Sequence, residues 1–380
     1  MRNFNYQNPT RIVFGRGTIA KITDLVPADA RILLTYGGGS IMQNGVHDQV
    51  MAALKGRDVL EYGGIEPNPT FETCMDAANL CRREKVDYLL AVGGGSVIDG
   101  TKFIAAAAKH EGGDPWEIMS TSGACIKSML PLATVLTLPA TGSEANSGSV
   151  ISRKSTEEKC VFGSPGAYPR FSILDPTTTF SLPANQVRNG VVDAFVHVVE
   201  QYATSDNGAM LQGRLAEGVL QTLVECGPTT LAEPENYDAR AEFMWSATMA
   251  LNGLLGQGVV SDWATHMIGH ELTAFYGLAH AETLAVILPG VWRANLEAKC
   301  TKLEQMGSRV FGVDGAEAAI EATESFFHGL GMPTRLSDHG VDAAEAATRI
   351  VERFEARGTV LGEGKDLTPV RVGEVVKSRA

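Results

Sequence analysis

The stretch DYLLAVGGGSVIDG, residues 87–100, predicts the architecture of the N-terminal half of the chain. Its first part, Asp87 to Val92, is a short apolar run typical of a buried β-strand, and Ser96 to Ala108 is typical of a helix. Glycines join the two directly, which is where open α/β sheets bind a nucleotide pyrophosphate. The usual G-x-G-x-x-G spacing is absent, because the loop reads G-G-G-S-x-x-D and ends at Asp99. The alternative is that the glycines form only a tight turn.

The same alternation of strand and helix signals extends through the first half of the chain. Strand-like runs recur at Arg31 to Tyr36, Asp58 to Tyr62 and Leu132 to Leu138. A helical stretch follows the first of these to about Leu54, and another runs from Thr70 to Lys85. This pattern predicts a doubly wound, mostly parallel, Rossmann-like sheet with helices on both faces, in the α/β class.

Strand signals fade after about Pro183, and helical periodicity dominates the rest of the chain. Examples are Asn185 to Thr204, Trp263 to Phe275 and Ala316 to Gly329. A length of 380 residues suits two domains. We therefore predict a dinucleotide-binding α/β domain at residues 1–183 and an all-helical domain at residues 184–380.

Composition excludes several classes of partner. The net charge of −12 and the pI of about 5.2 disfavour binding to nucleic acid. No apolar run approaches the roughly 18 residues that would span a bilayer, and no signal peptide is indicated at the N-terminus. The six cysteines form no C-x-x-C pair, which fits a reducing compartment. We expect a cytoplasmic protein with no membrane or nucleic acid partner.

A second glycine loop, Gly37-Gly38-Gly39-Ser40, ends the strand predicted at Arg31 to Tyr36. Many NAD enzymes place a carboxylate here for the adenosine ribose. No Asp or Glu lies between Arg31 and Asn44, so nothing acidic would repel a 2′-phosphate. The glycine amides and the Ser40 hydroxyl can donate to that phosphate, and the following helix would add its positive end. The loop therefore predicts a preference for NADPH over NADH.

A third loop, L-P-A-T-G-S-E at 138–144, also follows a strand. Thr137, Thr141 and Ser143 supply hydroxyls there, and in a parallel sheet the loop would face the same edge as the glycine loops. Lys159 can meet a phosphate, although a lone lysine is usually a solvated surface residue.

Asp193 and His197 occupy positions i and i+4 within the apolar run Val191 to Val199. Helical spacing places both on one face. A buried carboxylate and imidazole need partners, and metal coordination satisfies both. The alternative is a hydrogen-bonded Asp–His pair in the core.

Three of the eight histidines, His266, His270 and His280, lie within 15 residues. The first two form H-x-x-x-H rather than H-E-x-x-H, which argues against a zinc peptidase. One Asp with two or three imidazoles suits Fe²⁺ or Zn²⁺ with an open coordination position. The set lacks thiolates, which argues against a closed structural zinc site.

In combination these motifs resemble the iron-dependent (group III) alcohol dehydrogenases over essentially the whole chain. The matching motifs are G-G-G-S-V-I-D at 93–99, L-P-A-T-G-S-E at 138–144, D-A-F-V-H at 193–197 and the histidine set. More narrowly, R-I-L-L-T-Y-G-G-G-S, E-P-N-P at 66–69 and V-D-A-F-V-H-V-V-E-Q-Y at 192–202 are similar to the NADPH-dependent aldehyde reductases of the butanol-dehydrogenase-like branch.

The resemblance implies a complete site. The metal, iron or zinc, would be held by Asp193, His197, His266 and His280, with His270 as a catalytic residue near the substrate but off the metal. Implied cofactor contacts share the three loops and one lysine: Gly38, Gly39, Ser40, Gly94, Gly95, Ser96, Asp99, Thr137, Thr141 and Lys159. The implied reaction is hydride transfer between NADP(H) and small aldehydes or primary alcohols, mainly aldehyde reduction, in a cleft between the domains of a homodimer.

Two alternatives remain at this point. Sugar-phosphate cyclases related to dehydroquinate synthase share the architecture, but they need Lys and Arg for a substrate phosphate. The segments Gly190 to Tyr202 and Val259 to Pro289 contain neither, which disfavours them. The second alternative is a non-catalytic nucleotide- or metal-sensing module, which would bind cofactor without turnover.

Overall fold

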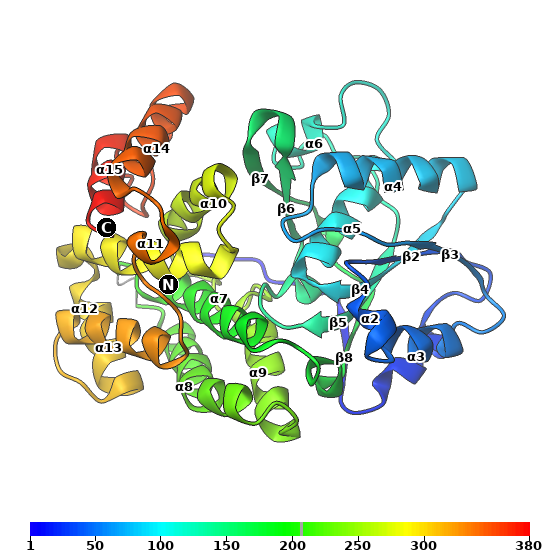
Figure 1. The fold of residues 1–380 in the computed structure, drawn as a ribbon, viewed down its shortest axis with the longest axis horizontal. Helices are drawn as coiled ribbons and strands as arrows, with labels where there is room; N and C mark the ends of the chain where they lie inside the picture. Colours follow the sequence, from blue (N-terminus) through cyan, green and yellow to red (C-terminus); the bar gives the residue numbers. More distant parts are fainter. Residues whose placement is uncertain (206–207) are drawn as a thin grey trace. The chain divides into compact units, whose positions relative to one another are not determined.

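The computed structural model describes residues 1–205 and 208–380. Contacts divide these residues into two compact units, which are described separately (Figure 1). The sheet unit comprises Gln7–Pro183 and Pro234–Thr248. The helical unit comprises Met1–Tyr6, Ala184–Glu233 and Met249–Ala380.

The sheet unit is built on a parallel sheet, which has six strands within the described residues, in the order β1-β8-β5-β4-β2-β3. Its strands are β1 (Arg11–Phe14), β2 (Arg31–Tyr36), β3 (Asp58–Tyr62), β4 (Tyr88–Gly94), β5 (Leu132–Leu138) and β8 (Phe171–Leu174). The predicted parallel α/β sheet is confirmed, and β2 to β5 lie where the apolar runs placed them. Strands β1 and β8 were not predicted.

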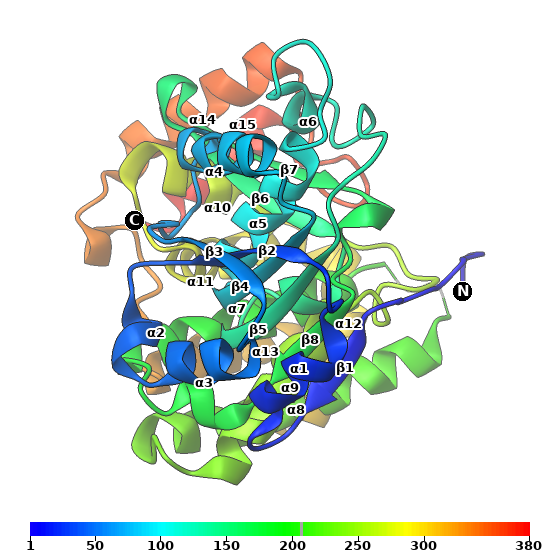
Figure 2. The same cartoon turned by 90° about the vertical axis from the view of Figure 1, so that its right-hand side faces the viewer.

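Helices cover both faces of this sheet (Figure 2). One face carries α1 (Ile22–Leu25), α2 (Ser40–Gln43) and α3 (Val46–Ala53), and the other carries α4 (Phe71–Glu84), α5 (Gly95–Ala107) and α6 (Glu117–Ser120). Successive strand residues therefore pack into the hydrophobic cores on opposite faces of the sheet. Leu34 packs into the core beneath α3, and Leu33 packs into the core beneath α4 and α5. Burial on both faces explains why the inner strands β2, β4 and β5 read as continuous apolar runs.

An antiparallel pair, β6 (Gly148–Arg153) and β7 (Glu158–Gly163), stands apart from the main sheet. Strand β6 packs against α5, so this hairpin lies on the α5 side of the unit. Short helical turns occur in both units. Those of the sheet unit are η1 (Thr18–Lys21), η2 (Ser143–Ala145), η3 (Lys154–Thr156), η4 (Pro165–Ala167) and η5 (Pro176–Thr179), and those of the helical unit are η6 (Gly307–Phe311) and η7 (Ser337–His339).

The helical unit has no named strand in its described part. Its helices are α7 (Ala184–Tyr202), α8 (Met210–Ala232), α10 (Ala264–Tyr276), α11 (His280–Ala294), α12 (Leu296–Met306), α13 (Ala316–Gly329), α14 (Ala343–Arg357) and α15 (Pro369–Lys377). Most of α9 (Tyr237–Ala250) belongs to the sheet unit. Helix α7 is the centre of the helical unit, because it packs against both α8 and α11 and every residue from Gly190 to Tyr202 is buried.

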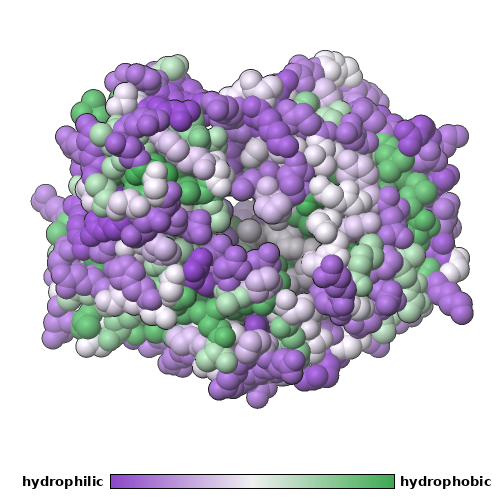
Figure 3. Space-filling view, in the orientation of Figure 1, coloured by the Kyte–Doolittle hydropathy of each residue, from purple (hydrophilic) through white to green (hydrophobic). Residues whose placement is uncertain are grey.

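Among the described helices, none combines the length and the apolar character needed to cross a membrane. The face drawn in Figure 3 is largely hydrophilic, with hydrophobic residues scattered over it in small groups.

Candidate metal centre and nucleotide-binding loops

Imidazoles converge on one carboxylate oxygen in the helical unit. Asp193 Oδ1 lies 3.6 Å from His197 Nδ1, 4.0 Å from His266 Nε2 and 3.7 Å from His280 Nε2. These separations exceed the usual range of hydrogen bonds. They are close to the spacing of about 3.4 Å between ligand atoms at the corners of a tetrahedron with bonds of about 2.1 Å.

Three helices supply this cluster. The i, i+4 spacing on α7 presents Asp193 and His197 on one face, α10 supplies His266, and His280 is the first residue of α11. Asp193, His266 and His280 offer ligand atoms within 4.8 Å of one another. The ring of His197 stacks on His266, with centroids 4.6 Å apart. The structure therefore brings all four expected ligands together.

The cluster fits a bound cation on structural grounds. Asp193 is 3% exposed, and its Oδ1 makes no hydrogen bond with any residue that the structure describes. A buried carboxylate oxygen without a partner is costly. A divalent cation held by one carboxylate and neighbouring imidazoles removes that cost, and this donor set suits Fe²⁺ or Zn²⁺.

His270 lies beside the cluster. Its ring centroid is 6.4 Å from that of His266 and 5.4 Å from that of His280. The side chain is buried on α10, one turn beyond His266. His270, like His197, lies outside the set of Asp193, His266 and His280, whose ligand atoms are within 4.8 Å of one another, so its position beside the metal rather than on it stays a prediction.

Glu200 has a place in this site that sequence reasoning missed. Its Oε2 is hydrogen-bonded to Nδ1 of His266, and its Oε1 accepts from the Thr265 N–H at 2.7 Å. Burial raises the pKa of the Glu200 carboxyl well above its usual range, and the negative charge of Asp262 adds to the shift. The sequence signal was a carboxylate directly after the apolar run Val191 to Val199, on the fully buried part of α7.

In the sheet unit, the first and third loops lie against each other. A Cβ on Gly95 would stand 2.4 Å from Oγ1 of Thr141, and one on Gly94 would stand 2.9 Å from Cβ of Leu138. Any side chain at these positions would force the loops apart. Ser96 follows in the first turn of α5, and the N-cap residue Gly94 makes no side-chain hydrogen bond to the N–H groups at this helix start.

Asp99 and Lys102, on α5, brace the third loop. Asp99 Oδ1 accepts from Ser143 Oγ at 2.6 Å, and Asp99 Oδ2 accepts from the Val150 N–H at 2.9 Å. Lys102 is fully buried and donates to the Gly148 carbonyl at 2.7 Å, and burial lowers its pKa to about 8. The structure thus uses both oxygens of Asp99 within the protein, and its contact with a cofactor stays a prediction.

The remaining predicted contacts are spread over the same unit. Thr137 is buried at the end of β5, and Thr141 is partly exposed beyond it. Lys159, on β7, donates to Oδ1 of Asn68 at 2.9 Å. Asn68 comes from the E-P-N-P stretch and has a left-handed backbone, with φ of 54°. The lysine is therefore oriented by a neighbouring loop.

The Gly38–Ser40 loop is open. A Cβ on Gly38 or Gly39 would meet nothing within 4 Å, and Gly39 has φ of +92°. The helix expected to run to Leu54 is interrupted after Gln43, because Asn44 and Gly45 break it into α2 and α3. With four residues, α2 has little macrodipole, so a phosphate bound here would depend on backbone amides and Ser40 rather than on the helix end.

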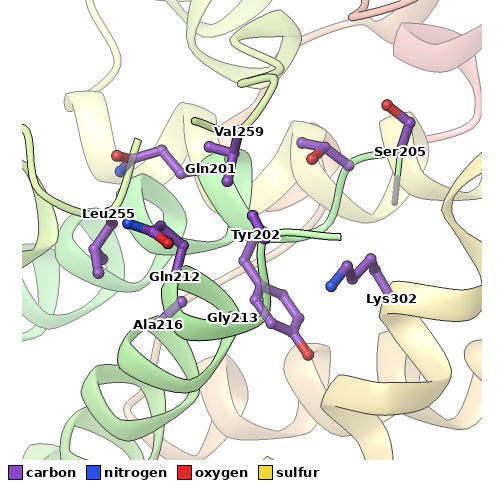
Figure 4. A pocket seen from close by; sticks show the side chains of 11 residues that line it. Gln201, Tyr202, Ser205, Gln212, Gly213, Ala216, Leu255, Val259 and Lys302 are labelled. Atoms are coloured by element: carbon purple, nitrogen blue, oxygen red, sulfur yellow. The ribbon is translucent and has the colours of Figure 1, made fainter. Parts of the chain in front are cut away.

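A separate pocket lies in the helical unit, beside the C-terminal end of α7 (Figure 4). Gln201, Gln212 and Lys302 are among its polar lining residues, and the Lys302 ammonium lies 5.4 Å from the Tyr202 ring centroid. Its described lining includes neither His270 nor any of the four residues of the metal cluster.

Comparison with known proteins identifies the class that this fold and site define. The family model described as iron-containing alcohol dehydrogenase matches residues 9–176. The model of the C-terminal part of the Fe-containing alcohol dehydrogenase family matches residues 188–361. The chain belongs to the iron-containing alcohol dehydrogenase family. The resemblance drawn from the motifs is confirmed, and the sugar-phosphate cyclase alternative is disfavoured.

Individual relatives narrow the comparison. The chain is 56% identical over 376 residues to the NADPH-dependent aldehyde reductase YqhD of Escherichia coli (strain K12), covering 97% of each chain. It is 45% identical to NADP-dependent alcohol dehydrogenase 3 of Entamoeba histolytica, covering 97% of this chain and 96% of the relative. Among solved structures, E. coli YqhD aligns with a TM-score of 0.98 at 55% identity, covering 100% of this chain and 99% of the other. NADH-dependent butanol dehydrogenase A from Thermotoga maritima aligns with a TM-score of 0.93 at 37% identity, with coverages of 100% and 99%.

Proposed function

We propose that this chain is an NADPH-dependent aldehyde reductase that transfers hydride to small aldehydes and, in reverse, oxidises primary alcohols. The observation that carries the proposal is the convergence of His197, His266 and His280 on the buried Oδ1 of Asp193. The 56% identity to a relative described as an NADPH-dependent aldehyde reductase supports the substrate class and the cofactor.

Asp193, His197, His266 and His280 are the proposed metal ligands, and Asp193 supplies the one negative charge among them. When bound there, a divalent ion, iron as in the family's name or zinc, would supply Lewis acidity toward a carbonyl oxygen. His270 lies beside this cluster, and we propose that it is the catalytic relay that exchanges a proton with a substrate oxygen.

NADP(H) is the proposed cofactor, and it would supply the hydride. Gly38, Gly39 and Ser40 would receive the 2′-phosphate, because the segment from Arg31 to Asn44 contains no carboxylate. Contacts proposed for the rest of the cofactor are Gly94, Gly95, Ser96, Asp99, Thr137, Thr141 and Lys159. The tight packing of Gly95 on Thr141 supports a shared surface for the first and third loops.

We further propose that the protein acts as a cytoplasmic homodimer with no membrane or nucleic acid partner. The net charge of −12 supports the exclusion of nucleic acid, because it would repel a phosphate backbone. The homodimer follows from the family resemblance, and size-exclusion chromatography with light scattering would test it.

The proposed activity is tested by following NADPH absorbance with a panel of short aldehydes, using protein loaded with Fe²⁺ or Zn²⁺. We expect turnover of small aldehydes, higher kcat/KM with NADPH than with NADH, and higher kcat/KM for reduction than for alcohol oxidation at neutral pH. Bound cofactor without turnover on any aldehyde would instead support the sensing module. Clear superiority of alcohol oxidation at pH 7 would overturn the proposed direction.

A further inference from the structure

We propose that Glu200 is a positioning residue that fixes the tautomer and the ring orientation of His266 and thereby sets the affinity of the metal centre. The inference rests on the proposed ligand set. Glu200 does not belong to that set, because its carboxylate is engaged on the side of the His266 ring that faces away from Asp193.

The two nitrogens of His266 face different partners. Nδ1 is hydrogen-bonded to Glu200 Oε2, whereas Nε2 lies 4.0 Å from Asp193 Oδ1. A neutral imidazole has one N–H donor and one acceptor nitrogen, and a carboxylate can only accept. Nδ1 therefore carries the hydrogen and Nε2 presents its lone pair toward Asp193. Metal-bound histidines commonly use such a carboxylate to orient the ring and to raise its basicity.

Glu200 is itself held in place. Its Oε1 accepts from the Thr265 N–H at 2.7 Å, and its backbone carbonyl accepts from the Asp262 N–H at 2.8 Å. The residue is 4% exposed. These contacts join α7 to the start of α10 immediately before His266, so the carboxylate cannot move without moving the helix that carries the ligand.

A buried ion pair strengthens the same junction. Lys299 is 1% exposed and donates to Asp262 Oδ2 at 2.8 Å and to the Ala203 carbonyl, just beyond the end of α7, at 2.9 Å. Asp262 Oδ1 in turn accepts from the Ala264 N–H, the first residue of α10, at 3.0 Å. Lys299 and Asp262 therefore connect the end of α7 to the start of α10, next to the Glu200–His266 contact.

The charge of the Glu200 carboxylate would also contribute to the attraction of the site for a cation. With a divalent cation bound, the ionised carboxylates of Asp193 and Glu200 would together balance its charge, beside imidazoles that must be neutral to act as ligands. Removing the charge of Glu200 should therefore weaken the attraction for the cation as well as release the ring of His266.

Glu217 offers a matched control. It is also 4% exposed, it lies on α8 of the same unit, and its Oε1 accepts from Tyr202 Oη at 2.9 Å and from Arg309 at 2.7 Å. Among the residues that the structure describes, its side-chain partners Tyr202, Arg214, Gln305 and Arg309 all lie outside the proposed ligand set. Glu217→Gln therefore reproduces the loss of a buried, hydrogen-bonded carboxylate without touching the proposed metal centre.

The test measures metal affinity in wild type, Glu200→Gln, Glu200→Asp and Glu217→Gln, by competition for Zn²⁺ with a chelator and by the visible spectrum of the Co²⁺ form. We expect both Glu200 variants to bind Zn²⁺ about 10–100-fold more weakly and to shift the Co²⁺ bands. The aspartate variant keeps the charge but is one methylene too short to reach Nδ1. Glu217→Gln should match the wild type, and the KM for NADPH should stay constant throughout.

Circular dichroism establishes that each variant is folded before its affinity is compared. A folded Glu200→Gln or Glu200→Asp protein with wild-type Zn²⁺ affinity and an unchanged Co²⁺ spectrum would overturn the positioning role alone. Equal weakening in Glu217→Gln would also overturn it, because the effect would then follow from loss of any buried carboxylate. A wild type that binds no metal would overturn the proposed centre itself, and this inference with it.

Discussion

The metal cluster of the helical unit and the glycine loops of the sheet unit are built on opposite principles. The cluster depends on polar side chains that are buried together, with Asp193 Oδ1 at its focus. The loops depend on side chains being absent, because a Cβ on Gly95 would stand 2.4 Å from Thr141. Substitution in the cluster should therefore remove a chemical group, whereas substitution in the loops should change shape.

This contrast predicts different kinds of failure. A buried ligand that loses its partners leaves unpaired polar groups, and the cost is electrostatic. A glycine that gains a side chain displaces its neighbours, and the cost is steric. Metal content should therefore respond only to changes in the helical unit, and nucleotide affinity mainly to changes in the sheet unit.

The largest effect is expected for Asp193→Ala. The variant loses the anionic ligand, so the metal should be lost and aldehyde reduction should fall on the order of a thousandfold, since Lewis-acid stabilisation is worth several kcal/mol at about 1.4 kcal/mol per tenfold. His266→Ala should behave alike. Elemental analysis and NADPH oxidation measure the two quantities, and full metal occupancy in either variant would rule out the ligand set.

A smaller effect is expected for His270→Ala. The side chain lies beside the cluster, and loss of a proton relay costs about a hundredfold or more. The metal should remain at the wild-type level, which separates this variant from His266→Ala on the same helix. Loss of metal equal to that of His266→Ala would show that His270 is a ligand.

The next effect concerns cofactor choice, and Gly38 is the better position to test it than Gly39. Gly39 has φ of +92°, so any side chain there adds backbone strain, whereas Gly38 is in open space without that restriction. Gly38→Asp should lower kcat/KM with NADPH about tenfold to a hundredfold, by repelling the 2′-phosphate and competing for its donors. Gly38→Asn is the neutral control, and the metal content should not change. An unaltered ratio of NADPH to NADH efficiency in Gly38→Asp would mean that the phosphate binds elsewhere.

The smallest expected effect is a difference in the free energy of unfolding between alanine variants of two glycines in the sheet unit. Gly95→Ala should lower the free energy of unfolding by about 1–3 kcal/mol through overpacking against Thr141. Gly38→Ala should stay within about 0.5 kcal/mol, because its Cβ meets nothing within 4 Å. Thermal or denaturant unfolding compares the pair, and equal stabilities would contradict the close packing of the two loops.

Much of the fold could be predicted because its signals are local. Strands β2, β4 and β5 are apolar runs closed by glycines or by a polar turn, β3 is a short strand-like run closed by glycines, and α7 and α10 carry helical spacing over many residues. Strands β1 and β8 have four residues each and are defined by pairing between Arg11 and Phe171, which are far apart in the chain. A four-residue run has too little periodicity to distinguish a strand from a loop.

The site shows the same limit. Spacing on one helix predicted that Asp193 and His197 share a face, but the approach of His280 depends on how α11 packs against α7. The Glu200–His266 contact joins residues 66 positions apart, and the bracing of the third loop by Asp99 joins residues 44 positions apart. Side chains that hold other side chains in place leave no pattern in the local sequence, because their partners are set by tertiary packing.

The most direct test of the account is a metal titration of the metal-free wild-type protein, with NADPH oxidation by a short aldehyde as the readout. The rate should rise from near zero in proportion to added Fe²⁺ or Zn²⁺ and level off at about one ion per chain, since one carboxylate and three imidazoles form one site. Asp193→Ala should show no rise over the same range. A metal-free protein that already reduces the aldehyde at the full rate, or an Asp193→Ala protein that is activated like the wild type, would contradict the account.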